Sequence, residues 1–130
     1  MAHILVADDD IEQLRMQQAL LEAMGYEVTV AQSAAETLSM LASAGPDLLV
    51  MDLRFPTVYD GLGLIRDVRA SGYGGPLILM SGWPNDLYGA PEEKLVTRVV
   101  VKGSVRELLL VIAELVAERA ATATRKSAPA

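Results

Sequence analysis

Residues 47–52 read DLLVMD, in which four consecutive apolar side chains stand between two aspartates. A strand with one solvent-facing side would alternate apolar with polar residues, and this segment does not. Continuous apolar strands are typical of parallel sheets, which are covered by helices on both faces. The segment therefore predicts a buried strand that ends at Asp52.

Strand-like and helix-like segments alternate on both sides of this strand. The other predicted strands are 3–7, 26–31, 76–80 and 99–101. Helices are predicted at 11–24, from 33 to the stop at 45–46, at 61–71 and from 105 onward. Strands that alternate with helices form a parallel sheet covered on both faces. We therefore expect an α/β fold with a doubly wound five-stranded parallel sheet, order 2-1-3-4-5, of flavodoxin-like type.

The segment 83–97 departs from this regular alternation. Its helix-breaking residues are Pro84, Gly89 and Pro91. Proline inside a helix costs ~3 kcal/mol and glycine about 1 kcal/mol, so a regular fourth helix is disfavoured. We expect a shortened or irregular fourth helix of about one to two turns, beginning at Glu92 and anchored only by Leu95 and Val96. So short a helix predicts a mobile segment.

Length and composition indicate one folded domain. The chain has 130 residues, of which 52% are hydrophobic, enough for a full core. We expect a domain over 1–121 and a disordered tail over 122–130. A net charge of −6 with scattered basic residues argues against direct nucleic-acid binding. The chain lacks cysteine, a signal peptide and any apolar run near the ~20 residues of a membrane span, so we expect a cytoplasmic protein without membrane contact.

Polar residues gather where the predicted strands end. Asp8 and Asp9 follow the first strand, and Asp52 ends the third. Ser81 follows the fourth strand and Lys102 the fifth. Ligands of open α/β sheets bind at these carboxyl ends, so the three acids should converge with the other two residues beside them. Such an all-oxygen site suits Mg²⁺, which would allow Asp52 to stay ionised and to attack phosphorus.

These segments together resemble the receiver domain of two-component response regulators, of chemotaxis-regulator type. The matching motifs are ILVADDD at 4–10, DLLVMD at 47–52 followed by a proline and DG, LILMSG at 77–82, and VVVK at 99–102. The resemblance implies a signalling switch rather than an enzyme acting on a separate substrate. It also implies a histidine kinase or phosphotransfer protein as donor and a downstream protein as target.

The resemblance also implies a role for each site residue. Asp52 would be the phosphoacceptor, and Ser81 and Lys102 the two switch residues. The implied Mg²⁺ ligands are Asp9 directly, Asp8 partly through water, Asp52, and the backbone carbonyl of Arg54.

Several positions depart from the family pattern. The loop FPTVYDG at 55–61 is about one residue longer than the common version. Arg54 and Trp83 stand at positions that influence phosphorylation and dephosphorylation rates in the family. Val99 stands where an aromatic switch residue is usual. Gly103 replaces a proline, and we expect the bond before it to be trans because a cis bond without proline costs about 3 kcal/mol.

Three other interpretations remain at the level of sequence. The chain could be a receiver-like interaction module that acts without phosphorylation. An aspartyl phosphohydrolase of the haloacid dehalogenase type would need a second acid where Arg54 stands. A flavodoxin would need Gly, Ser or Thr amides in the first loop, which is acidic here. For single residues, helix capping alone would explain Asp10 but not Asp8 and Asp9, and His3 is expected to be structural.

Overall fold

The computed structural model describes residues 2–127, in which the strands form one five-stranded sheet. They are β1 (His3–Ala7), β2 (Glu27–Ala31), β3 (Leu48–Asp52), β4 (Leu77–Ser81) and β5 (Arg98–Val101). All neighbouring strands are parallel, and their order is β2-β1-β3-β4-β5. The predicted fold class and strand order are therefore confirmed.

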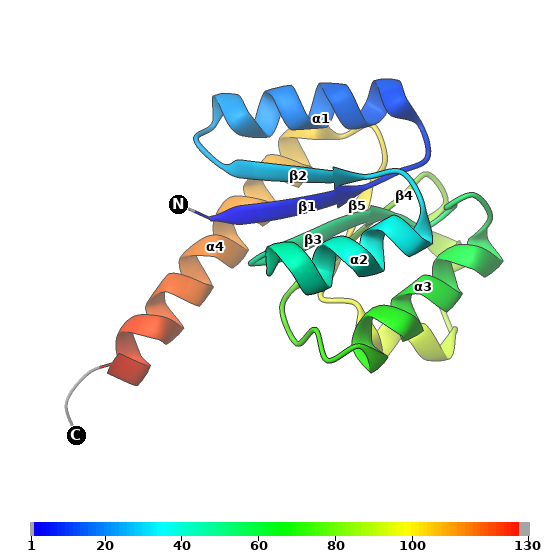
Figure 1. Cartoon of the computed structure of the whole chain (residues 1–130). Coiled ribbons are helices and arrows are strands. Elements are labelled where there is room, and N and C mark those ends of the chain that lie inside the picture. Colours follow the sequence, from blue (N-terminus) through cyan, green and yellow to red (C-terminus); the bar gives the residue numbers. More distant parts are fainter. Residues whose placement is uncertain (1, 128–130) are drawn as a thin grey trace.

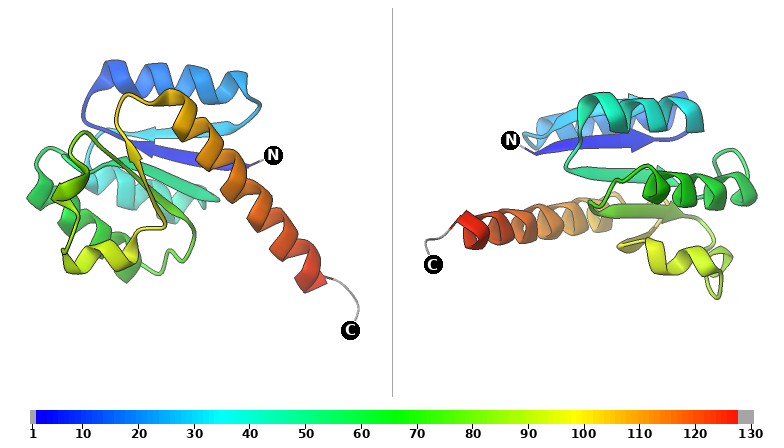
Figure 2. Two further views of the ribbon diagram at one scale, coloured as in Figure 1. Left: turned by 180° about the vertical axis from the view of Figure 1, so that it is seen from behind. Right: turned by 60° about the horizontal axis from the view of Figure 1, so that its bottom comes forward.

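Within the same residues, α-helices cover both faces of the sheet (Figure 1, Figure 2). They are α1 (Ile11–Ala23), α2 (Ala34–Ala44), α3 (Val58–Ala70) and α4 (Val105–Ser127). One hydrophobic core joins the sheet to α1 and α4, and the other joins it to α2 and α3. Alternate residues of β3 enter opposite cores, Leu48 and Val50 one and Leu49 and Met51 the other. This two-sided burial is the reason for the continuous apolar run.

Strand register aligns the ends of the strands at one edge. Ala7 of β1 lies beside Met51, the residue before Asp52. Asp52 lies beside Met80, and Ser81 lies beside Val101. The residues that follow these strands therefore meet at one carboxyl edge, as predicted.

The start of α3 was predicted three residues too late. The helix begins at Val58, because the Thr57 hydroxyl accepts a hydrogen bond from the Asp60 amide and caps it. Part of the predicted loop is therefore the first turn of a helix. Gly61 lies in that turn, where a Cβ atom would lie 1.7 Å from the Leu53 carbonyl oxygen. Only glycine allows this close approach between α3 and the chain after β3.

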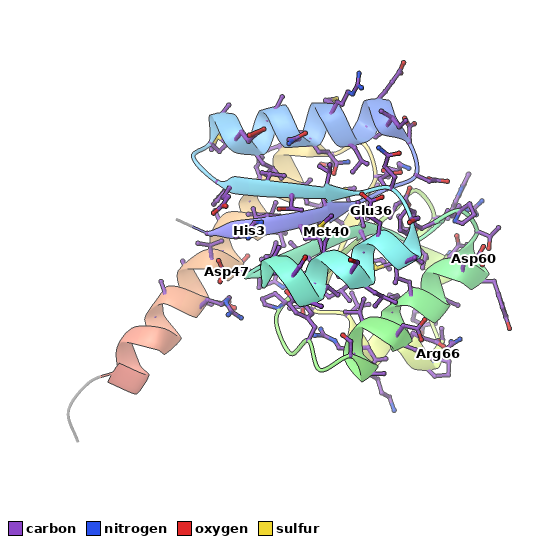
Figure 3. All side chains as sticks on the ribbon, in the orientation of Figure 1. His3, Glu36, Met40, Asp47, Asp60 and Arg66 are labelled. Carbon is purple, nitrogen blue, oxygen red and sulfur yellow. The ribbon has the colours of Figure 1, made fainter. Side chains whose placement is uncertain are left out.

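The fourth helix is replaced by two short 3₁₀ helices, as the prolines predicted. They are η1 (Pro84–Asp86) and η2 (Pro91–Leu95). The prediction that Leu95 and Val96 alone anchor the short helix that begins at Glu92 was wrong. Glu92 of η2 is buried in an ion pair with Arg66 of α3, and Leu87, which lies between the two 3₁₀ helices, is buried in the core. Figure 3 labels Arg66 on α3.

The last helix extends beyond the predicted domain boundary at residue 121. It continues to Ser127 and projects past the sheet (Figure 1). The prediction of a disordered tail from residue 122 therefore differs from the structure over 122–127, a stretch without glycine or proline that continues the helix. Residues 128–130 lie outside the described residues. No helix among residues 2–127 is both long and apolar enough to cross a membrane.

Candidate functional site

Three carboxylates meet at the carboxyl edge of the sheet. Asp8 and Asp9 follow β1, and Asp52 is the last residue of β3. Each offers one carboxylate oxygen, and these three oxygens lie within 4.8 Å of one another. Asp8 and Asp52 are buried, whereas Asp9 is exposed. The predicted convergence of the three acids is therefore present in the structure.

The Asp8 carboxylate has an unsatisfied buried oxygen. Its Oδ1 accepts a hydrogen bond from the Asp10 amide at 3.0 Å, and its Oδ2 has no hydrogen-bond partner. Burial raises the pKa of Asp8 to about 6; the Asp52 and Asp9 charges act in the same direction, and the Asp10 amide and Lys102 oppose it. An unpaired buried carboxylate oxygen beside two other acids fits a divalent cation, which would supply the missing partner.

Asp10 serves a different purpose from its two neighbours. Its side chain accepts hydrogen bonds from the amides of Glu12 and Gln13 and caps α1. The helix cap therefore accounts for Asp10 alone. Asp8 and Asp9 do not cap the helix and belong to the acidic cluster.

Asp52 is held by a lysine and by a backbone amide. Lys102 Nζ lies 2.5 Å from Asp52 Oδ2, and the Arg54 amide donates to Oδ1 at 3.3 Å. Burial disfavours the charge of Lys102, but its hydrogen bond to Asp52 and the nearby carboxylates outweigh this and raise its pKa. The lysine is therefore a fixed positive charge against the carboxylate that it contacts.

Ser81 ends β4 beside these residues and is buried. Its Oγ accepts a hydrogen bond from the Trp83 amide at 3.0 Å, and its carbonyl accepts one from the Lys102 amide at 2.9 Å. Because Oγ is the acceptor in this contact, its own proton remains available for an incoming oxygen.

Arg54 and Trp83, which stand at two of the positions that depart from the family pattern, contact one another. The Arg54 guanidinium carbon lies 5.7 Å from the centre of the Trp83 ring. The same guanidinium forms an ion pair with Asp86 of η1. Sequence reasoning missed Asp86, because it stands 32 positions from Arg54 and no local pattern marks it. Trp83 is 62% exposed.

Of three smaller predictions, those for His3 and for the Lys102–Gly103 bond are confirmed, and the third stays a prediction. His3 has the expected structural role, since its Nε2 lies 2.6 Å from Thr29 Oγ1 on the neighbouring strand. Within residues 2–127 the only cis peptide bond is Phe55–Pro56, so the Lys102–Gly103 bond is trans, as expected. The role of the Arg54 backbone carbonyl as a Mg²⁺ ligand stays a prediction.

Comparison with known proteins identifies relatives of this chain. The family model described as the response regulator receiver domain matches residues 4–109. The response regulator MprA of Mycobacterium avium (strain 104) is 37% identical over 78 residues, which are 60% of this chain and 34% of that protein. MprA of Mycobacterium tuberculosis (strain ATCC 25618 / H37Rv) matches with the same identity and coverage. The match thus spans about a third of the length of these curated relatives.

Solved structures give the same family. The response regulator TrrA from Thermotoga maritima, in complex with Mg²⁺ and BeF, has a TM-score of 0.79 and 25% identity, covering 88% of this chain and 99% of that one. The receiver domain of the Francisella response regulator 1452 has a TM-score of 0.78 and 26% identity, covering 88% and 96%. With the strand order, the acidic cluster and a family match over most of its length, the chain belongs to the response regulator receiver domain family.

Proposed function

We propose that this receiver domain accepts a phosphoryl group on Asp52 in a Mg²⁺-dependent reaction and thereby acts as a signalling switch. The contact between Asp52 Oδ2 and Lys102 Nζ at 2.5 Å carries the proposal. Asp52 is the acid of the cluster that combines burial, this fixed cation and the hydroxyl of Ser81 on the adjacent strand. Those are the groups that a transferring phosphoryl group requires beside its acceptor.

The residues of the site divide the chemistry between them. A carboxylate oxygen of Asp52 forms a bond to phosphorus while the bond from phosphorus to the donor nitrogen or oxygen breaks. The Lys102 ammonium and the Ser81 hydroxyl donate hydrogen bonds to the phosphoryl oxygens. Asp8, Asp9, Asp52 and the Arg54 carbonyl would hold Mg²⁺, which supplies positive charge that offsets the repulsion between the acids and the incoming group.

The partners follow from this chemistry. We assign the donor to a histidine kinase or a phosphotransfer protein and the output to contacts with a downstream protein, with no direct contact to nucleic acid or membrane. The switch catalyses only its own phosphorylation and slow dephosphorylation, in the cytoplasm. TrrA, a relative of similar fold, is described in complex with Mg²⁺ and BeF, which supports the assignment of the cofactor.

A receiver-like interaction module that acts without phosphorylation is the alternative. The replacement of the fourth helix by η1 and η2 favours it, because that region differs from the regular alternation of the fold. The unsatisfied Asp8 Oδ2 and the Asp52–Lys102 contact argue against it, since a module without ligand chemistry has no need of either.

Trp83 is the only tryptophan of the chain and reports on this choice. Purified protein is titrated with Mg²⁺ and then with beryllofluoride while tryptophan fluorescence and Mg²⁺ binding heat are followed. A phosphoacceptor site binds Mg²⁺ at millimolar concentration or below and responds to beryllofluoride only when Mg²⁺ is present. Asp52→Asn should abolish the beryllofluoride response. A folded wild-type protein that binds neither ligand would support the interaction module instead.

A further inference from the structure

A small cavity lies between α1 and the loop that joins β5 to α4. Its volume is about 30 Å³, and its walls come from α1, from the last residues of β4 and β5, and from the first turn of α4. The helices α1 and α4 cover the same face of the sheet and share one hydrophobic core (Figure 2). The cavity therefore lies where this core meets the β5–α4 loop.

Gln17 of α1 lines this cavity with a buried amide that lacks a partner. The residue is 5% exposed, and its Oε1 has no hydrogen-bond partner among residues 2–127. Gln17 continues the buried stripe of Leu14 and Leu21 on α1, where an apolar side chain would serve the packing better. A buried amide oxygen without a partner is unfavourable, so we infer that a polar group meets Gln17 inside the cavity.

The α4 side of the cavity offers further polar groups. Ser104 and Val105 line it, and the Ser104 hydroxyl has no hydrogen-bond partner within the described part of the chain. The first amides of a helix also lack an acceptor within the helix. Lys102 lines the cavity as well, but its ammonium contacts Asp52. A hydroxyl and backbone amides of α4 are therefore available to whatever binds Gln17.

One water molecule fits this cavity in size and in chemistry. A cavity needs roughly 10–15 Å³ to hold a water, and a buried water makes about three hydrogen bonds to groups that lack other partners. The volume of about 30 Å³ admits such a molecule but not an organic ligand. A water can donate to Gln17 Oε1 and accept from the α4 side, whereas an anion would be repelled by the amide oxygen and a cation by the nearby Lys102 ammonium.

We propose that this cavity binds one ordered water, which joins the Gln17 side chain to the first turn of α4. The water thereby ties α1 to the loop that carries Lys102, whose amide is bonded to the Ser81 carbonyl. The proposal concerns the protein without a phosphoryl group or a metal ion. It therefore stands or falls independently of the proposed function.

The test counts long-lived internal waters by ¹⁷O magnetic relaxation dispersion of the solvent. Wild type, Gln17→Met and Gln18→Met are compared, and circular dichroism establishes that each is folded. Methionine keeps the unbranched shape of glutamine but offers only a weakly accepting thioether in place of the amide. Gln18→Met is the matched control, because it makes the same change one position further along α1 at a residue that does not line the cavity.

Wild type and Gln18→Met should hold the same number of long-lived waters, and Gln17→Met should hold one fewer. An equal number in Gln17→Met and wild type would overturn the inference. If Gln17→Met does not fold, a crystal structure of the wild type decides the question by itself. An ordered water within hydrogen-bond distance of the Gln17 amide supports the proposal, and a dry cavity or a direct protein partner for that amide contradicts it.

Discussion

The ionised form of Asp8 is disfavoured in the metal-free protein, because this carboxylate is buried and one of its oxygens lacks a partner. Burial raises its pKa from 3.8 to about 6. Between these values the folded protein keeps a proton that the unfolded chain has released. The contribution of Asp8 to the free energy of unfolding therefore falls as pH rises from about 4 to about 6 and stays low above that range.

Asp8→Asn should remove this pH dependence. In EDTA we expect the variant to gain stability relative to wild type as pH rises through the window from 4 to 6, by up to roughly 3 kcal/mol. Urea unfolding at a series of pH values measures the difference. Asp9→Asn, which removes an exposed charge from the same cluster, should retain most of the wild-type dependence. Saturating Mg²⁺ should favour wild type, because metal binding stabilises only a folded state that keeps its ligands. A stability difference between Asp8→Asn and wild type that is constant from pH 4 to 7 would contradict the account.

Lys102 is the residue through which the fold should sense the phosphoryl group. Its Nζ contacts Asp52 and its amide is bonded to the Ser81 carbonyl, so a shift of the side chain acts on two strands. Lys102→Ala should still take up a phosphoryl group, roughly tenfold or more slowly, but lose the coupled conformational change. Intact mass measures uptake, and tryptophan fluorescence measures the response. Arg106→Ala, which changes an exposed arginine, is the control. A full fluorescence response in phosphorylated Lys102→Ala would refute this role of Lys102.

At the scale of elements, η2 is attached to α3 by arginines. Arg66 forms an ion pair with the buried Glu92, and Arg69 donates two hydrogen bonds to the Leu95 carbonyl. Glu92→Gln should lower the free energy of unfolding by about 1–2 kcal/mol, because it removes the charge from a buried hydrogen-bonded pair whose arginine is half exposed. Glu93→Gln, at the exposed neighbouring residue, should change it by less than about 0.5 kcal/mol. Equal effects of the two substitutions in urea unfolding would show that the ion pair contributes nothing.

Mobility of the segment 83–97 stays a prediction. Two short 3₁₀ helices have few internal hydrogen bonds, so their amides should exchange faster than those of the buried part of α4. Hydrogen exchange with and without beryllofluoride and Mg²⁺ measures this directly. We expect the amides from Asn85 to Leu95 to be less protected than those near Ile112 and to change protection when the ligand binds. If these amides are as protected as those near Ile112 and do not change when the ligand binds, the segment is a rigid part of the fold.

The elements differ in how far the sequence alone predicts them. Apolar runs and the Pro84–Pro91 interruption correctly predicted all five strands and the broken fourth helix, because both signals are local. Thr57 and Asp60 also formed a readable capping pattern, and the early start of α3 was missed because the segment was taken as loop. The anchoring of η2 could not be predicted, since Glu92 and Leu95 bind arginines 26 positions away on α3.

At the scale of the whole molecule, the sheet assembles the site from residues 8 to 102 of the chain. The strand order, which the sequence predicts, places the three acids, the serine and the lysine at one edge of the sheet. Their convergence could therefore be predicted without knowledge of any side-chain contact. The contacts of Arg54 with Trp83 and Asp86 could not be predicted, because they depend on the path of two loops. The chain carries a net charge of −6, and three of its acidic residues meet in the acidic cluster, where a divalent cation would offset their repulsion.

The central claim is that Asp52 alone accepts the phosphoryl group. The most direct test is the intact mass of wild type and Asp52→Asn after incubation with acetyl phosphate and Mg²⁺, with circular dichroism to establish that both are folded. The account predicts one phosphoryl adduct on wild type, its loss when EDTA removes Mg²⁺ before the donor is added, and no adduct on Asp52→Asn. A phosphoryl adduct that persists on folded Asp52→Asn would contradict it.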